Sequence, residues 1–231
     1  VINNVTFTAK QNQITALIGP SGCGKSTLLK LMSRLYDYDS GRILIGGHDI
    51  KTVDTECLFK KISVVFQDGV LFNTSIMENI RIGNTNATDD EVREVAKIAG
   101  CQEIIDRLPE GIQTIVGENG AKLSGGERQR ISIARAMLKD APIIIFDEAT
   151  ANIDPENEDK LKLAIESLTK NKTVIMIAHR LKTIRNANQI LVLNKGCIEQ
   201  RGTHDELMRQ DGIYKDFINA KSMSENWSLN N

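Results

Sequence analysis

The stretch Gly19-Pro20-Ser21-Gly22-Cys23-Gly24-Lys25-Ser26 decides the fold of this chain. It fits the spacing G-x-x-x-x-G-K-[ST], in which glycines let backbone N–H groups surround phosphate oxygens, a lysine reaches the terminal phosphates and a hydroxyl binds magnesium. The motif therefore indicates a site for a nucleoside triphosphate. The alternative is a plain glycine turn that joins a strand to a helix without any ligand.

The residues on either side of this loop have the pattern that the motif requires. Ile14-Thr15-Ala16-Leu17-Ile18 is a short apolar run typical of a buried strand. Apolar residues then recur at helical spacing after the loop: Leu28, Leu29, Leu31, Met32 and Leu35. A helix that begins at the loop adds unpaired N–H groups and partial positive charge to the site. The flanks therefore favour a ligand-binding loop over the plain turn.

A second glycine stretch, Leu123-Ser124-Gly125-Gly126-Glu127, has the pattern of a helix start. Ser124 and Glu127 form an S-x-x-E capping box, which predicts a helix beginning at Ser124. Gly125 and Gly126 leave that N-terminus open, so that a phosphate could approach the backbone closely. Taken alone, the S-x-x-E pattern favours an ordinary capped surface helix.

Together with Arg128-Gln129-Arg130, this second stretch resembles the signature motif of the ABC ATPases. The apolar run Ile143-Ile144-Ile145-Phe146 followed by Asp147 and Glu148 resembles the Walker B motif of the same family. The resemblance implies that Asp147 helps to hold magnesium and that Glu148 polarises the attacking water. A pair of solvated acids at the end of a buried strand is the alternative.

Two further polar residues follow apolar runs and match motifs of the family. Gln67, after Ile62-Ser63-Val64-Val65-Phe66, matches the Q-loop glutamine, whose amide touches magnesium or water. His179, after the run from Thr173 to Ala178, matches the switch histidine that donates to the γ-phosphate. Either residue alone would be an ordinary loop residue, so both assignments depend on the order of the motifs.

Two features depart from the family pattern. Ala151-Asn152-Ile153-Asp154 resembles the D-loop but differs from its usual wording at three positions, and turn capping ahead of Pro155 explains Asp154 equally well. Family members also carry an aromatic residue upstream of the first strand, where it stacks on adenine. Val1 to Phe7 aligns with the segment after that aromatic residue. We therefore expect a fragment that lacks the upstream adenine-stacking segment and the transmembrane domain.

The resemblance implies ATP and Mg²⁺ as cofactors and assigns residues to each. The residues expected to bind ATP are Gly19, Pro20, Ser21, Gly22, Cys23, Gly24, Lys25, Ser26, Thr27, Gln67, Leu123, Ser124, Gly125, Gly126, Glu127, Asp154 and His179. Those expected to hold Mg²⁺ are Ser26, Gln67 and Asp147. Those expected to act in catalysis are Lys25, Gln67, Glu148 and His179.

Composition excludes several classes of protein. With 231 residues, of which 41% are hydrophobic and 26% charged, the chain is long enough for one large globular domain. Its 29 basic and 30 acidic residues create no global positive field, so we expect no nucleic-acid partner. The 4 cysteines form no C-x-x-C pair, which suits a reducing cytoplasmic setting.

The pattern along the chain predicts an α/β fold: a P-loop NTPase core with a mainly parallel sheet, an antiparallel β subdomain and an inserted α-helical subdomain. Val5-Thr6-Phe7-Thr8 is an early strand candidate, and Asn194-Lys195-Gly196 is a hairpin turn. We expect residues 1–231 to form a single ABC ATPase domain. Its nucleotide-binding core would consist of residues 1–68 and 140–221, its helical subdomain of residues 69–139, and a disordered tail of residues 222–231.

In the ABC family, the phosphate loop of one copy and the serine-capped helix of another hold the same ATP. The resemblance therefore implies a second ABC ATPase domain as partner, in a homodimer or a heterodimer. Nucleotide binding would join the two copies and hydrolysis would release them.

Three stretches resemble exporters in particular: 67–76, 114–120 and 202–207. The expected function is ATP-driven export, with a transmembrane domain as partner at the cytoplasmic face of the cell membrane. Val70, Leu71 and Phe72 would form the docking surface, and burial of this trio in the domain's own core is an equal alternative. A freestanding importer subunit and a soluble, non-transport ABC ATPase are the alternative functions.

Overall fold

The computed structural model describes residues 1–66, 69–147, 155–178 and 181–228. The chain divides into two compact units, each with its own core. The first unit contains Val1–Leu58, Ile145–Glu148 and Thr173–Asn231, and the second contains Phe59–Ile144 and Ala149–Lys172.

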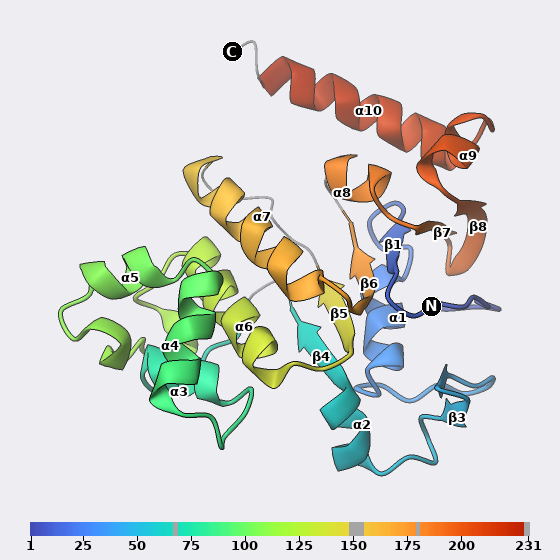
Figure 1. Ribbon diagram of the computed structural model, residues 1–231. Helices are drawn as coiled ribbons and strands as arrows, with labels where there is room; N and C mark the ends of the chain where they lie inside the picture. The colour runs from blue at the N-terminus through green and yellow to red at the C-terminus, as the bar shows by residue number, and fades with distance from the viewer. Residues whose placement is uncertain (67–68, 148–154, 179–180, 229–231) are drawn as a thin grey trace. The chain divides into compact units, whose positions relative to one another are not determined.

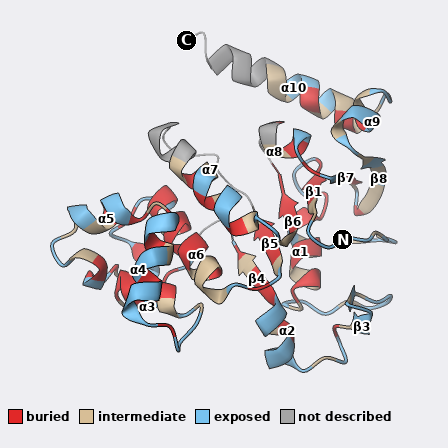
Figure 2. Cartoon of the chain, in the orientation of Figure 1, coloured by how far each residue is buried: buried red, intermediate tan, exposed pale blue. Residues whose placement is uncertain are grey.

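A mainly parallel sheet forms the core of the first unit (Figure 1). Strand β1 (Ile14–Ile18) pairs in parallel with β6 (Thr173–Ile177) on one side and with β7 (Gln189–Asn194) on the other. The whole strand order is β4-β5-β6-β1-β7-β8, in which β4 belongs to the second unit and β5 (Ile143–Asp147) contributes residues to both units. Figure 2 shows β1 and β6 as buried strands, as expected of apolar runs inside a parallel sheet.

The last strand of the sheet, β8 (Cys197–Gly202), returns antiparallel to β7. Lys195 and Gly196 form the turn, both with positive φ, which is the geometry that suits a two-residue hairpin. The pairing shifts by one residue between Val192 and Leu193, so that the hairpin contains a bulge. The predicted hairpin turn at residues 194–196 is therefore confirmed.

Helices complete the first unit: α1 (Lys25–Met32), α8 (Leu181–Arg185), α9 (His204–Met208) and α10 (Ile213–Ser228). Thr203 caps α9 in a full capping box with Glu206. Helix α10 continues to Ser228, whereas the sequence analysis expected an unordered tail from Ser222. The helix is anchored at its first turns by the buried side chain of Tyr214, and no glycine or proline follows Gly212 to end it.

A second, very small sheet also belongs to the first unit. Strands β2 (Leu44–Ile45) and β3 (His48–Asp49) pair antiparallel, which is the predicted antiparallel part of the α/β fold. Residues 5–8 form no strand, contrary to expectation. Alternation of apolar residues is not sufficient for a strand, because a strand also needs a neighbour that accepts and donates its backbone hydrogen bonds.

The second unit is mostly helical, and its central element is α6 (Gly125–Lys139). This helix contacts α3 (Ile76–Arg81), α4 (Asp89–Ile98), α7 (Pro155–Thr169) and strand β4 (Ile62–Val65). The unit also contains α5 (Gln102–Arg107) and the short 3-10 helices η1 (Gly111–Gln113) and η2 (Glu118–Gly120). Helix α2 (Thr55–Lys61) crosses the boundary between the units in sequence.

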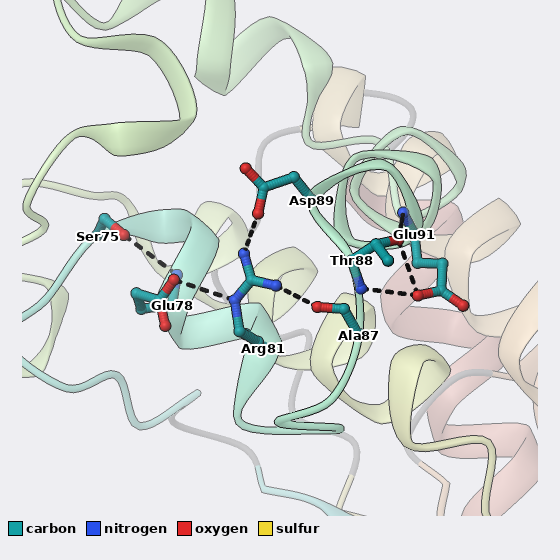
Figure 3. A network of polar contacts seen from close by, with 7 residues as sticks. All are labelled: Ser75, Glu78, Arg81, Ala87, Thr88, Asp89 and Glu91. Atoms are coloured by element: carbon teal, nitrogen blue, oxygen red, sulfur yellow. Dashed lines mark hydrogen bonds and ion pairs between the residues drawn. The ribbon is translucent and has the colours of Figure 1, made fainter.

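A network of polar contacts joins α3 to α4 in the second unit (Figure 3). The Arg81 guanidinium contacts Glu78 at 3.1 Å and Asp89 at 2.5 Å, and it also donates to the carbonyl of Ala87. Next to it, the side chain of Thr88 caps α4 in the predicted capping box with Glu91. One arginine therefore ties the end of α3 to the start of α4.

The predicted helical block at 69–139 lies within the second unit, which also takes in β4 and α7. Among the described residues, no helix combines the length and the apolar character needed to cross a lipid bilayer.

Candidate nucleotide-binding site

The glycine loop lies between β1 and α1 in the first unit, as the motif predicts. Gly24 occupies the N-cap position of α1 with φ 107°, a conformation that L side chains rarely adopt. No side chain caps the helix and its first turn contains no acidic residue. The N-terminus of α1 therefore keeps backbone donors and partial positive charge for an anion.

The Lys25 side chain is enclosed by its own loop. Its Nζ donates to the carbonyls of Gly19 at 2.8 Å and Pro20 at 2.9 Å, and lies 3.7 Å from Sγ of Cys23. An ammonium group has three donors, and here the loop's own carbonyls accept from it. The positive charge is thus held inside the loop, next to the backbone that the motif assigns to phosphate.

Two of the residues expected to hold Mg²⁺ are described, and both belong to the first unit. Ser26 is exposed in the first turn of α1, directly after Lys25. Asp147 is the half-buried last residue of β5. A hydroxyl and a carboxylate are hard oxygen donors of the kind that Mg²⁺ prefers, so the described part of this donor set fits the ion.

Four predicted site residues, Gln67, Glu148, Asp154 and His179, lie outside the described residues. The strands and the helix that adjoin these four residues in the chain are described. Strand β4 ends two residues before Gln67, and β5 ends immediately before Glu148. Strand β6 ends two residues before His179, and α7 begins directly after Asp154.

The second glycine stretch forms the N-terminus of α6 in the second unit. The Ser124 side chain accepts from the N–H of Glu127 at 3.3 Å, and the Glu127 carboxylate accepts from the N–H of Ser124 at 2.8 Å. The predicted helix start is therefore confirmed, with both halves of the capping box present. Ser124 and Gly125 are exposed, whereas Leu123 and Gly126 are buried. The 15-residue helix thus presents an accessible N-terminus.

An ion pair that the sequence analysis missed supports this helix start. Nη2 of Arg107, at the end of α5, lies 2.8 Å from Oε1 of Glu127. The two residues belong to different helices and share no motif, so no local spacing indicates the pair. Glu127 therefore uses one carboxylate oxygen for the cap and the other for Arg107.

The structure brings two of the three exporter-like stretches together within the second unit. Ser75 and Ile115 form an antiparallel bridge. The N–H of Ile76 donates to the carbonyl of Thr114 at 3.2 Å, and the N–H of Val116 donates to the carbonyl of Thr74 at 3.1 Å. Residues 69–76 and 114–120 thus form one paired surface, which we call the paired stretches.

The apolar trio of the sequence analysis is divided between surface and core. Leu71 is buried at 2% exposure, whereas Val70 and Phe72 are 51% and 57% exposed. Ile115, from the other of the paired stretches, is also 51% exposed. Burial in the domain's own core therefore holds for Leu71 alone. Val70, Phe72 and Ile115 are accessible, as the docking alternative requires, and docking stays a prediction.

A cavity of about 150 Å³ lies beside the first of the paired stretches. Its lining includes Phe66, Val70, Ile82, Arg135 and Lys139. Arg135 donates to the carbonyl of Val70 at 3.1 Å, and its guanidinium lies 5.9 Å from the centre of the Phe72 ring. Burial lowers the pKa of both Arg135 and Lys139, because it disfavours their charged forms. The cavity thus combines apolar walls with two partly buried cations.

Comparison with known families agrees with the motif order. The family described as ABC transporter matches residues 2–151 of the chain. A solved structure described as a bacterial Atm1-family ABC exporter with ATP bound is similar over 95% of this chain and 39% of its own. The TM-score is 0.88 and the sequence identity 42%. An α/β ABC ATPase fold is therefore shown by sequence and by structure.

Curated relatives at comparable identity include bacterial glucan export proteins and a fungal transporter. The β-(1→2)glucan export ATP-binding/permease protein NdvA of Agrobacterium fabrum is 49% identical over 96% of this chain and 38% of its own length. That of Brucella melitensis is 46% identical over 95% of this chain and 37% of its own. The mitochondrial iron-sulfur clusters transporter atm1 of Aspergillus fumigatus is 47% identical over 97% of this chain and 31% of its own. The chain thus spans between 31% and 38% of these relatives.

Proposed function

Because the chain belongs to the ABC transporter family, we propose that it is the ATP-hydrolysing part of an exporter. The observation that carries this proposal is that relatives named for glucan export match 95% to 96% of the chain, including the paired stretches. Exporter relatives favour this function over a freestanding importer subunit and over a soluble, non-transport ATPase.

The first unit supplies the binding of the phosphates. The N–H groups of the loop and of the first turn of α1 surround the phosphate chain of ATP. On binding, Lys25 exchanges the carbonyls of Gly19 and Pro20 for phosphate oxygens, which are stronger partners because they are charged. The ammonium inside the loop is therefore already at the place where the negative charge arrives.

Magnesium is the metal that the oxygen donors of this site fit. Ser26 and Asp147, together with Gln67, would hold the ion, which supplies charge neutralisation of the phosphates when it is bound. The chain's own part is to place a hydroxyl in the first turn of α1 and a carboxylate at the end of β5.

Hydrolysis depends mostly on positioning and on charge stabilisation, since phosphoryl transfer passes through a loose transition state. In the proposed mechanism Glu148 orients the attacking water and takes up its proton, while Lys25 stabilises the charge that develops on the phosphate. His179 donates a hydrogen bond to the γ-phosphate, and Gln67 orients the water and the metal.

The partner of the site is a second ABC ATPase domain. The exposed N-terminus of α6, with its partial positive charge, has the properties of a phosphate-binding surface. In the proposed dimer, Ser124 of one copy and the phosphate loop of the other contact the same ATP. Both arrangements, a homodimer and a heterodimer, preserve this contact.

The second proposed partner is the transmembrane domain of the same transporter. Val70, Phe72 and Ile115 form an accessible apolar group on the paired stretches, and helices at the cytoplasmic face of the cell membrane would pack against it. Sequence identity to this chain does not depend on which cargo a relative is named for, since the glucan and iron-sulfur cluster transporters are 49% and 47% identical to it. This chain is thus about equally similar to transporters that are named for chemically different cargo.

The dimer can be tested in a variant that binds ATP without turning it over. We expect Glu148→Gln to bind Mg-ATP and to sediment as a dimer, because it lacks the carboxylate that activates water. Adding Ser124→Arg places a long side chain at the N-terminus of α6, and its bulk would fill the space that the partner's ATP needs. This double variant should bind ATP and remain a monomer.

Thr88→Arg in the Glu148→Gln background is the matched control. Thr88 caps α4 with the same kind of capping box as Ser124 and is likewise exposed. The control therefore loses an equivalent cap and gains the same charge, and it should still dimerise. Dimerisation of the Ser124→Arg variant, or full hydrolysis by Glu148→Gln, would contradict the proposed mechanism.

A further inference from the structure

The β7–β8 hairpin contacts the phosphate loop at two points, and all of these residues belong to the first unit. At the turn, the N–H of Gly196 donates to the carbonyl of Cys23 at 3.1 Å. At the end of β7, a Cβ added to Gly19 would lie 2.1 Å from the carbonyl oxygen of Leu193, so the two backbones are in close contact. The hairpin thus contacts the loop at its first glycine, Gly19, and at Cys23.

The peptide units on both sides of Gly196 are engaged. Its carbonyl accepts from the N–H of Asn3 at 2.9 Å, and Sγ of Cys197 lies 3.2 Å from the carbonyl of Asn3. Gly196 has φ 80°, and a Cβ at this position would lie 2.0 Å from the carbonyl oxygen of Val1. Only glycine therefore fits between the first residues of the chain and the phosphate loop.

The hydrogen bond from Gly196 determines the direction of one particular peptide unit. In a planar trans peptide, the C=O and the following N–H point in opposite directions. Because the Cys23 carbonyl points at Gly196, the N–H of Gly24 points away from the hairpin. Gly24 is the N-cap of α1, where the motif assigns backbone donors to phosphate.

The bulge in the hairpin lies at the same place. Val192 pairs with Gln200, whereas the next residue, Leu193, pairs with Ile198, so Glu199 is the extra residue. The Asn194 side chain donates to the Glu199 carboxylate at 2.8 Å. Bulges bend and twist a strand pair and are frequent beside functional sites. The bulge in this hairpin lies at Leu193, the residue whose carbonyl contacts Gly19.

We infer that Gly196 is a positioning residue for nucleotide binding: its N–H holds the Cys23–Gly24 peptide so that Gly24 presents its own N–H to the phosphate chain. The inference rests on the proposed function, since it presumes that the loop binds a nucleotide. A loop whose donors are already oriented has less conformational entropy to lose when the ligand binds. The hairpin would therefore raise affinity without touching the ligand.

Gly196→Ala and Gly47→Ala form a matched pair that separates positioning from backbone strain. Gly47 has φ 85°, close to that of Gly196, and a Cβ there would meet nothing within 4 Å. Gly196→Ala should lose more stability in urea without nucleotide than Gly47→Ala, because its Cβ also meets the carbonyl oxygen of Val1, whereas Gly47→Ala adds backbone strain alone. The dissociation constant of a fluorescent ATP analogue, measured on the intact protein, should rise roughly tenfold in Gly196→Ala and stay unchanged in Gly47→Ala.

A second variant removes the hydrogen bond without adding an atom. Replacing Gly196 by glycolic acid exchanges its amide N–H for an ester oxygen, and affinity should fall about fivefold while residues 1–3 keep their room. Wild-type affinity in this ester or in Gly196→Ala, or equal losses in Gly196→Ala and Gly47→Ala, would overturn the inference. Failure of the wild-type protein to bind the analogue would instead contradict the proposed function.

Discussion

Arg107 and Glu127 form an ion pair between α5 and α6, with Nη2 2.8 Å from Oε1, at the residue that completes the capping box of Ser124. The Glu127 side chain is only 9% exposed, whereas that of Arg107 is 60% exposed. An exposed arginine thus provides the opposite charge for a carboxylate that is nearly buried. The N-terminus of α6 is held by α5 as well as by its own cap.

We predict that Arg107→Met lowers the free energy of unfolding by about 1 kcal/mol, because an exposed arginine is screened by water and the aliphatic part of the side chain remains. Urea denaturation measures the change. Arg93→Met is the control, since Arg93 is exposed on α4 and forms no ion pair among the described residues. Equal losses in the two variants would show that the contact with Glu127 contributes nothing.

Stability should fall at acid pH partly through Glu91. Its carboxylate accepts from the N–H and the hydroxyl of Thr88 at 2.7 and 2.9 Å, and these bonds hold the pKa of Glu91 below its usual 4.5 (Figure 3). Just below pH 4.5 the unfolded chain binds a proton at this residue and the folded chain does not. The stabilisation is therefore complete above 4.5 and is lost as the pH falls through the lower, folded pKa.

Denaturant unfolding between about pH 7 and about pH 3 tests this contribution. Glu91→Gln should lose less stability than the wild type over that range, because it has no carboxylate to protonate at the cap. Glu94→Gln, at an exposed position of the same helix outside the capping box, should follow the wild-type curve. A Glu91→Gln curve that is parallel to the wild type would refute the prediction.

Phe72→Glu should uncouple transport from ATP hydrolysis in the full-length transporter. Phe72 is 57% exposed, so its replacement should change the free energy of unfolding by about 0.5 kcal/mol or less. ATP binding should be unchanged, while stimulation of the ATPase by transported substrate should fall, because a charge enters an apolar docking surface. Ile98→Glu, at a 44% exposed position on α4, is the control and should remain coupled.

The neighbouring Leu71 should behave in the opposite way. Leu71→Ala removes a buried side chain, which is 2% exposed, and should cost about 2–5 kcal/mol of stability. Thermal or urea unfolding of the purified protein measures this loss. A stable Leu71→Ala variant with lost coupling would instead place Leu71 on the docking surface.

The cysteines should react with iodoacetamide in an order set by burial. Cys57 is exposed and should be labelled first, whereas burial raises the pKa of Cys101 to about 12, so that its thiolate is scarce at neutral pH. Cys23 is buried within the phosphate loop and should be labelled slowly, with loss of nucleotide binding. Mg-ATP should protect Cys23 from labelling, as peptide mass spectrometry would show. Equal labelling with and without Mg-ATP would exclude its contact with the bound nucleotide.

Local interactions explain which predictions from sequence are confirmed. The capping boxes at Ser124 and Thr88 join residues three positions apart, and the turn at Gly196 depends on adjacent residues. The expected strand at 5–8 and the expected end of order at Ser222 are different in kind. Both depend on what packs beside the segment, and sequence periodicity does not contain that information.

The sequence by itself determined the phosphate loop, the two helix starts and the family, because each depends on residue types at fixed short spacings. Only the tertiary structure decided that Arg107 meets Glu127, that Ser75 pairs with Ile115, and that Gly196 holds the Cys23 carbonyl. These contacts join residues that lie far apart in the chain. They form because packing of the strands and helices brings their backbones together, and no short-range pattern specifies that packing.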